Sequence, residues 1–142
     1  MKLKQFALSL ALIAPLGLVA AHANAATMST TGSFSLPEPA YWNETLLPAG
    51  DYTLSVGANP AGITVFSVKG EGITVNFLAM AVTGDTPERN ELKLEDTNGT
   101  YVIREFDAGT TGESYRFGVS KTVRNLMSRK EAPAVTVPVS GL

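Results

Sequence analysis

Apolar and polar residues alternate with a period of two along most of the chain beyond residue 33, which is the pattern of β-strands that bury one face. The clearest run is 51–56, where Tyr52, Leu54 and Val56 share one side. Similar runs occupy residues 34–36, 44–47, 63–68, 92–95, 101–106, 114–119 and 135–139. The pattern predicts an all-β domain, built as an antiparallel β-sandwich or a partly open barrel of about seven to nine short strands.

Turn residues separate these runs. Asn98-Gly99 between two alternating segments predicts a two-residue hairpin, because a type I′ turn needs two positive φ angles. Residues 47–50, Leu-Pro-Ala-Gly, predict a turn that joins 44–47 and 51–56 as the two arms of another hairpin. Pro138 has no backbone N–H to donate, so it places the last run at a sheet edge.

Two segments depart from simple alternation. Residues 73–82 form the longest apolar run, which predicts a central strand covered on both faces. A buried helix is the alternative, and the β-branched residues and flanking glycines disfavour it. Residues 120–131 lack strand alternation, and Val123, Leu126 and Met127 lie at helical spacing, so we expect a short helix near residues 120–131.

The first residues have the three zones of a cleavable signal peptide. Lys2 and Lys4 give a positive start, residues 6–20 are apolar, and the triplet 23–25, Ala-Asn-Ala, fits a small-x-small cleavage site. The apolar run is shorter than the roughly 20 residues needed to cross a bilayer, which disfavours an uncleaved anchor. The sequence predicts a signal peptide at 1–25 and a single β domain at 26–142, exported to the periplasm or the medium.

Cleavage of the predicted signal peptide, here called the leader, also removes a reactive side chain. The single histidine, His22, lies within it, and the chain has no cysteine. Ser-His-Asp and Cys-His mechanisms, the usual zinc sites, and haem or iron–sulfur ligation through these groups are then excluded. We expect no catalytic residue, no metal and no cofactor.

Charge and aromatic content limit the kinds of partner that we expect. Without Lys2 and Lys4, nine basic residues face 13 acidic ones, and this net charge of −4 disfavours nucleic acid. Acids dominate residues 85–113 and basic residues dominate 116–130. Two solvated faces explain this distribution, and head-to-tail attraction between copies is the alternative. Few residues are aromatic, which disfavours a transmembrane barrel, and we do not expect an integral membrane protein.

Several motifs together resemble a known group of proteins. The chain carries Phe34-x-Leu36-Pro37 and Leu47-Pro48-Ala49-Gly50-x-Tyr52-Thr53, then a glycine-turn hairpin, a long apolar strand and a basic tail before a valine-rich end. This arrangement resembles small exported β-domain proteins of unknown activity that are common in acidobacterial genomes. The resemblance implies an exported β domain and no particular functional residue.

Three functions fit these observations. The leading hypothesis is an exported non-catalytic structural or interaction domain, which self-associates or pairs with an envelope protein through edge segments 27–36 and 134–139. The alternative is a carbohydrate-binding module in which Tyr41 and Trp42 stack on a polysaccharide. A small carboxylate-dependent hydrolase, using Glu105 and Asp107 at the end of one strand, is the third.

Export is tested by the N-terminus of the protein recovered outside the cytoplasm. We expect N-terminal sequencing to begin at Ala26, because signal peptidase cleaves after a small-x-small triplet. Recovery of a chain that begins at Met1 would contradict the predicted signal peptide.

Overall fold

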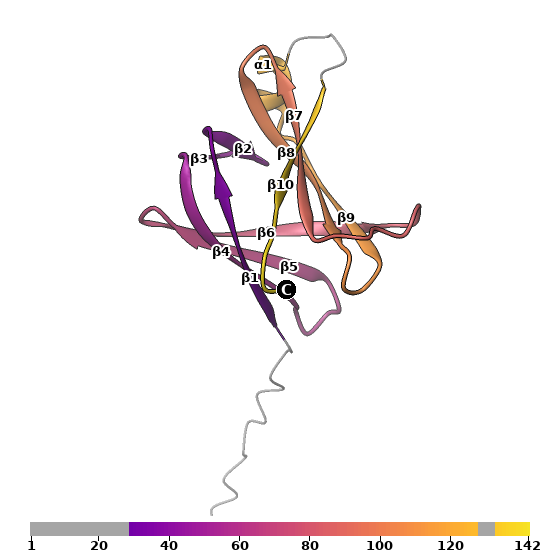
Figure 1. Ribbon diagram of the computed structural model, residues 1–142. Coiled ribbons are helices and arrows are strands. Elements are labelled where there is room, and N and C mark those ends of the chain that lie inside the picture. Colours follow the sequence, from indigo (N-terminus) through magenta and orange to yellow (C-terminus); the bar gives the residue numbers. More distant parts are fainter. Residues whose placement is uncertain (1–28, 128–132) are drawn as a thin grey trace, which may run out of the picture.

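The computed structural model describes residues 29–127 and 133–142 and shows an all-β fold with a short helix (Figure 1). The predicted signal peptide at 1–25, with His22, and residues 128–131 of the predicted helix region lie outside the described residues. The elements are β1 (Thr30–Leu36), β2 (Ala40–Trp42), β3 (Thr45–Leu47), β4 (Gly50–Ala58), β5 (Thr64–Gly70), β6 (Ile73–Val82), β7 (Glu91–Thr97), β8 (Thr100–Ala108), β9 (Glu113–Phe117), α1 (Lys121–Leu126) and β10 (Ala134–Pro138).

The predicted all-β class is confirmed, with one more strand than the upper end of the prediction among the described residues. The additional strand is β2, whose three residues between Pro39 and the turn at Asn43 are too few to reveal an alternation. No helix in the described part of the chain combines the length and apolarity that a membrane crossing requires.

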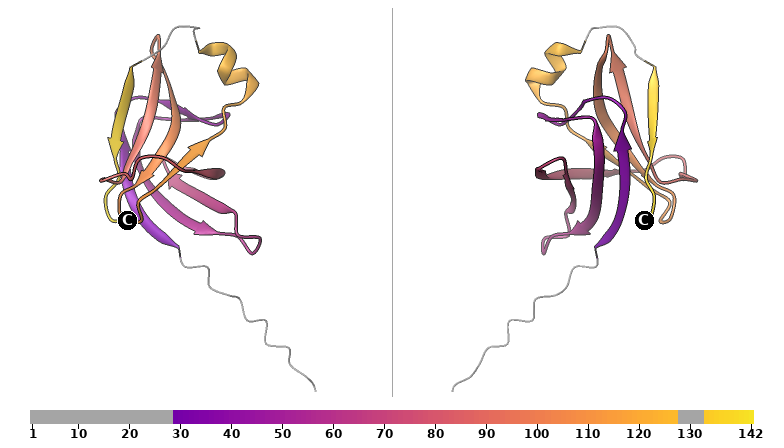
Figure 2. Two further views of the ribbon diagram at one scale, coloured as in Figure 1. Left: turned by 90° about the vertical axis from the view of Figure 1, so that its right-hand side faces the viewer. Right: turned by 60° about the vertical axis from the view of Figure 1, so that its left-hand side comes forward.

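The strands form one mixed sheet that folds over on itself. Its order is β1-β4-β5-β6-β9-β8, with β7 on the other edge of β8 and β10 beyond β7. Strand β6 joins the two halves of this sheet. Its residues 73–78 pair with β5 in the half that contains β1 and β4, and its residues 79–82 pair with β9 in the half that contains β8 (Figure 2). The result is a sandwich-like fold that does not close into a barrel.

One strand pair departs from the predicted antiparallel arrangement. Strand β2 runs parallel to β8, with Tyr41 opposite Val102. It pairs with residues 101–103 of β8, whereas β9 pairs with residues 105–108 along the same edge of β8. Strand β3 then pairs antiparallel with β2 and ends the sheet.

The first predicted edge segment, 27–36, pairs with Ser140, which directly follows the second segment, 134–139. The Ser33 N–H donates to the Ser140 carbonyl (2.7 Å), and the Ser140 N–H donates to the Ser33 carbonyl (2.8 Å). Pro138 in β10 has no N–H with which to extend this contact into a ladder. The seam is tight at Gly32, where an added Cβ would lie 2.7 Å from the Ser140 carbonyl oxygen.

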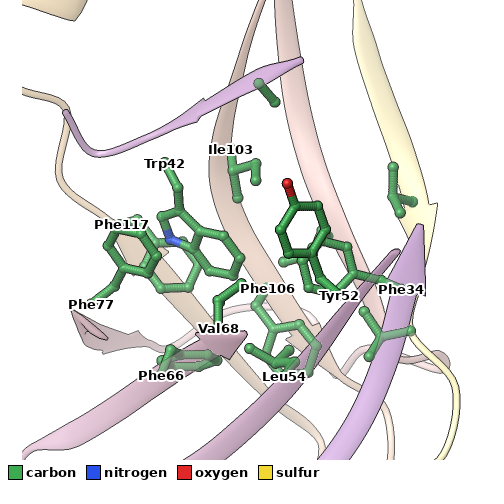
Figure 3. Close-up of a cluster of buried hydrophobic side chains, with 14 of the residues drawn as sticks. Phe34, Trp42, Tyr52, Leu54, Phe66, Val68, Phe77, Ile103, Phe106 and Phe117 are labelled. Atoms are coloured by element: carbon green, nitrogen blue, oxygen red, sulfur yellow. The ribbon is translucent and has the colours of Figure 1, made fainter. Parts of the chain in front are cut away.

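Aromatic rings fill the centre of the core (Figure 3). Trp42 has no exposed surface and stacks on Phe77, with ring centroids 4.8 Å apart and planes 3° apart. Phe117 meets the indole edge-on at 4.8 Å. The indole Nε1 has no hydrogen-bond partner among the described residues, so Trp42 contributes to stability through packing.

The predicted hairpin between 44–47 and 51–56 is wrong. Strand β3 pairs with β2, and β4 pairs with β1 and β5. The Leu-Pro-Ala-Gly segment instead leads the chain from one half of the sheet to the other. The buried Tyr52 holds this corner, because its hydroxyl donates to the Pro48 carbonyl at 2.7 Å, as in the tyrosine corners of other β-sandwiches.

The remaining local predictions have mixed outcomes. The Asn98-Gly99 hairpin is confirmed, with φ angles of 55° and 79°. The short helix is present as α1, and the Ser120 hydroxyl caps it by accepting from the Val123 N–H at 3.2 Å. The prediction that residues 73–82 are covered on both faces is wrong, because one face of β6 is open to solvent.

Removal of the Tyr52 hydroxyl tests the corner. We expect Tyr52→Phe to lower the free energy of unfolding by about 1 kcal/mol, the net value of one intramolecular hydrogen bond. Urea denaturation provides the measurement. Tyr41→Phe is the matched control, because within residues 29–127 and 133–142 the Tyr41 hydroxyl makes no hydrogen bond; an equal loss in both variants would contradict the corner's role.

Candidate functional site

A β-bulge determines which side chains reach the outer face of β8. Glu105 pairs with Lys93 but Ile103 pairs with Leu94, so Arg104 is an extra residue in the ladder. Such a bulge lets two consecutive residues lie on one side of a strand. Arg104 and Glu105 are both partly exposed and line the same outer groove, whereas Ile103 stays in the core.

The bulge places Glu105 in a network of charges, here called the charged row. The Lys93 ammonium lies 3.0 Å from Glu105 Oε1 and 2.7 Å from Asp107 Oδ2. On the neighbouring strand, Arg116 Nη2 lies 3.2 Å from Glu105 Oε2, and the Ser114 hydroxyl donates to Asp107 at 2.7 Å. The charged row therefore joins β7, β8 and β9 through side chains.

These contacts favour the charged forms of Asp107 and Lys93. Burial raises the pKa of Asp107, but the hydrogen bonds from Lys93 and Ser114 outweigh it and lower the pKa below its ordinary value. The hydrogen bond to Asp107 raises the pKa of Lys93 against the opposing effect of burial, and Glu105 adds to the rise. An Asp107 held as a carboxylate is poorly suited to be the protonated acid that glycoside hydrolysis needs.

The predicted carboxylate pair is thus brought together, but as an ion-pair network. Glu105 and Asp107 share one ammonium, and each also has a second partner on β9. The groove beside Glu105, of about 320 Å³, also contains Arg104, whose Nε lies 3.4 Å from the Glu95 carboxylate.

A second groove adjoins the charged row and is here called the arginine groove. Its floor is apolar, and its volume is about 540 Å³. The groove is lined by Ile63, Leu78, Ala79, Met80, Phe117, Gly118 and Val119 together with Arg104, Arg116 and Arg124. Among the described residues that line it there is no Asp or Glu.

The apolar floor is unusually open. The exposed fractions of Leu78 and Met80 are 63% and 76%, and that of Ile63 is 44%. Phe77 and Ala79 point into the core, so alternation along β6 forces Leu78 and Met80 outward. Met80 lies directly opposite Arg116 on β9, which brings the apolar floor against the charged row.

The predicted aromatic pair does not form a sugar-stacking platform. Tyr41 and Trp42 are neighbours in β2, and successive side chains of a strand point to opposite faces. Trp42 therefore lies in the core with no exposed surface, and Tyr41 alone reaches the outside. There it lines a shallow groove of about 170 Å³ with Glu38, Leu46 and Tyr101.

Sequence reasoning missed the arginine groove for two reasons. The continuous apolar run in β6 predicts a strand buried on both faces, whereas in the structure Leu78 and Met80 on one face are exposed. Arg104 reaches the groove beside the bulge, and a bulge depends on the register between β7 and β8. The basic residues of the predicted 116–130 region gave the one available signal.

Comparisons of the chain with protein-family models, curated proteins and solved structures find no match. The resemblance to exported β domains therefore stays a prediction. Within the two described ranges, no three carboxylate or imidazole side chains gather as a metal site would require.

Lys93→Met tests the charged row. Loss of the ammonium leaves Asp107 desolvated without its main partner, so we expect the free energy of unfolding at neutral pH to fall by about 1–2 kcal/mol, between the values for exposed and buried ion pairs. Thermal unfolding provides the measurement. Lys69→Met, at an exposed position in β5, is the matched control and should change stability little.

The pH dependence follows from the same two groups. The lowered pKa of Asp107 means that its contribution is present above its unfolded pKa and is lost as the pH falls through its folded value, below 3.8. The raised pKa of Lys93 means that its contribution is lost only as the pH rises above 10.5. In Lys93→Met the pKa of Asp107 should rise, so acid unfolding should begin at a higher pH; an unchanged acid transition would contradict the network.

Proposed function

We propose that this protein is an exported, non-catalytic interaction domain that binds a partner macromolecule through the arginine groove. The observation that carries the proposal is the exposure of Leu78 and Met80 side by side on the outer face of β6. Single exposed apolar residues are ordinary, but a contiguous apolar patch with a polar rim is typical of an interaction surface.

The chemistry of the arginine groove suits binding. Burial of a Leu or Met side chain contributes about 1.5–3 kcal/mol each, so covering Leu78 and Met80 gives a partner a substantial anchor. Arg and Met are enriched at protein interfaces, whereas Lys and Glu are depleted there. Arg116 and Arg124 stand beside the apolar floor in this arrangement.

The non-catalytic part of the proposal has separate support. The chain that remains after the predicted leader has neither imidazole nor thiol. The most enclosed carboxylate among the described residues, Asp107, pairs with Lys93 and accepts a hydrogen bond from Ser114. The export that the leader predicts would place this surface among envelope or extracellular macromolecules.

The outer face of β6 is a better contact surface than the two edge segments expected to pair with a partner. The first of those segments already pairs through Ser33 with Ser140, which directly follows the second, and Leu142 packs over Gly32 beside them. Leu78 and Met80, by contrast, are uncovered in the described structure.

Site-specific photo-cross-linking tests the proposal. A benzoylphenylalanine at position 80 should cross-link a macromolecule when the producing cells are irradiated, and Leu78→Asp on the same chain should reduce that product at least about tenfold, as loss of an interface anchor does. The same probe at Thr53, an exposed position on β4, is the matched control and should give no product. Absence of a position-80 product from a folded, exported chain would contradict the proposed function.

A further inference from the structure

We propose that the occupant of the arginine groove is a second copy of this chain, which inserts its β2–β3 hairpin so that copies join head to tail. This inference rests on the proposed function and specifies its partner. Here the hairpin means residues 38–47, from Glu38 through β2 and β3.

The groove selects an acidic, apolar occupant. Three arginines line it together with apolar residues, and no carboxylate is present among the described lining residues. Arg104 and Arg116 have carboxylate partners outside the groove, whereas Arg124 donates to the backbone carbonyl of Val119 at 3.2 Å. Because like charges oppose each other, the arginines disfavour docking of one groove onto the same groove of another copy.

The hairpin offers the complementary surface. Leu46 is 49% exposed, and Tyr41 lies directly opposite it on the same face of the hairpin. Glu38 and Glu44 are exposed beside them. No Lys or Arg occurs anywhere between residues 29 and 68, so this part of the molecule carries only negative charge.

The hairpin also has a free backbone edge. Within the described sheet, β3 pairs with β2 alone, which leaves the N–H and C=O groups of its outer edge available to another chain. Three residues are too few to form an extended sheet between copies. The contact would instead combine a few backbone hydrogen bonds from β3 with side-chain contacts. Leu46 would pack on the apolar floor of the groove, and Glu38 and Glu44 would lie near its arginines.

The two surfaces are on different elements and share no lining residue. The groove is lined by residues of β6, β8, β9 and the last turn of α1, whereas the hairpin consists of β2 and β3 and pairs with β8. Trp42 of β2 packs on Phe77 and Phe117 on the core side of β6 and β9, whereas Leu78 and Met80 of the groove floor are on the outer side of β6. Each copy can therefore use both surfaces at once, and such a heterologous contact produces rings or open chains.

Light scattering of the exported protein tests the inference through two variants. Met80→Glu adds a carboxylate to the groove floor, and Leu46→Lys adds a positive charge to the hairpin. The unmodified protein should increase in mass with concentration, and each variant alone should stay monomeric. Each substitution is at an exposed side chain, and circular dichroism confirms that the variants fold.

Mixing the two variants separates head-to-tail from symmetric association. The Leu46→Lys copy keeps its groove and the Met80→Glu copy keeps its hairpin, so an equimolar mixture should form dimers although neither variant does so alone. A symmetric interface would not be restored by mixing. Thr53→Lys on β4 is the matched control and should assemble as the unmodified protein does.

A charge exchange tests the electrostatic part. Arg124→Glu and Glu44→Arg should each weaken association by about tenfold, and the double variant should recover most of the loss. A monomer at all concentrations, or a mixture that forms no dimers while the unmodified protein associates, would overturn the inference. If one of these results overturns the inference but position 80 cross-links to a different macromolecule, the proposed function still holds.

Discussion

The stack of Trp42 on Phe77 decides which surfaces of this protein face outward. Trp42 holds β2 against β8, and Phe77 fixes the inner face of β6. Since side chains of a strand alternate, burying Trp42 turns Tyr41 outward, and burying Phe77 turns Leu78 outward. One aromatic contact in the core therefore orients both the hairpin and the arginine groove, and any change that moved the indole would disturb the two surfaces together.

The register between paired strands, and not proximity in the sequence, determines which charged side chains meet. The bulge in β8 turns Arg104 and Glu105 to the same side, and the β8–β9 pairing brings Glu105 to Arg116. Ion pairs of this kind stabilise the outer face modestly, and they pair Arg104 and Arg116 with carboxylates, so that Arg124 is the lining arginine without a carboxylate partner among the described residues. The acidic first part of the domain and the basic face of β9 and α1 thus remain separate, which favours contacts between molecules over contacts within one.

Much of the fold could be predicted because alternation is a local property. The half-buried strands, the Asn98-Gly99 turn and the helix start at Ser120 follow from residues within a few positions of one another. The site could not be predicted, because it depends on pairing between distant segments: Lys93 meets Glu105 only after a bulge, and β3 joins β2 instead of β4. The carbohydrate-binding alternative, which needs an exposed Trp42, stayed open for the same reason, since the three residues of β2 become a strand only through their contact with β8.

The emission of Trp42, the single tryptophan of the chain, tests this account most directly. The exported protein should emit at the short wavelengths of an apolar environment, and iodide in solution should not quench that emission, because the indole has no exposed surface. Emission like that of free tryptophan, with full quenching by iodide, would contradict the account, since β2 would then lie outside the core and neither outward face would be oriented as described.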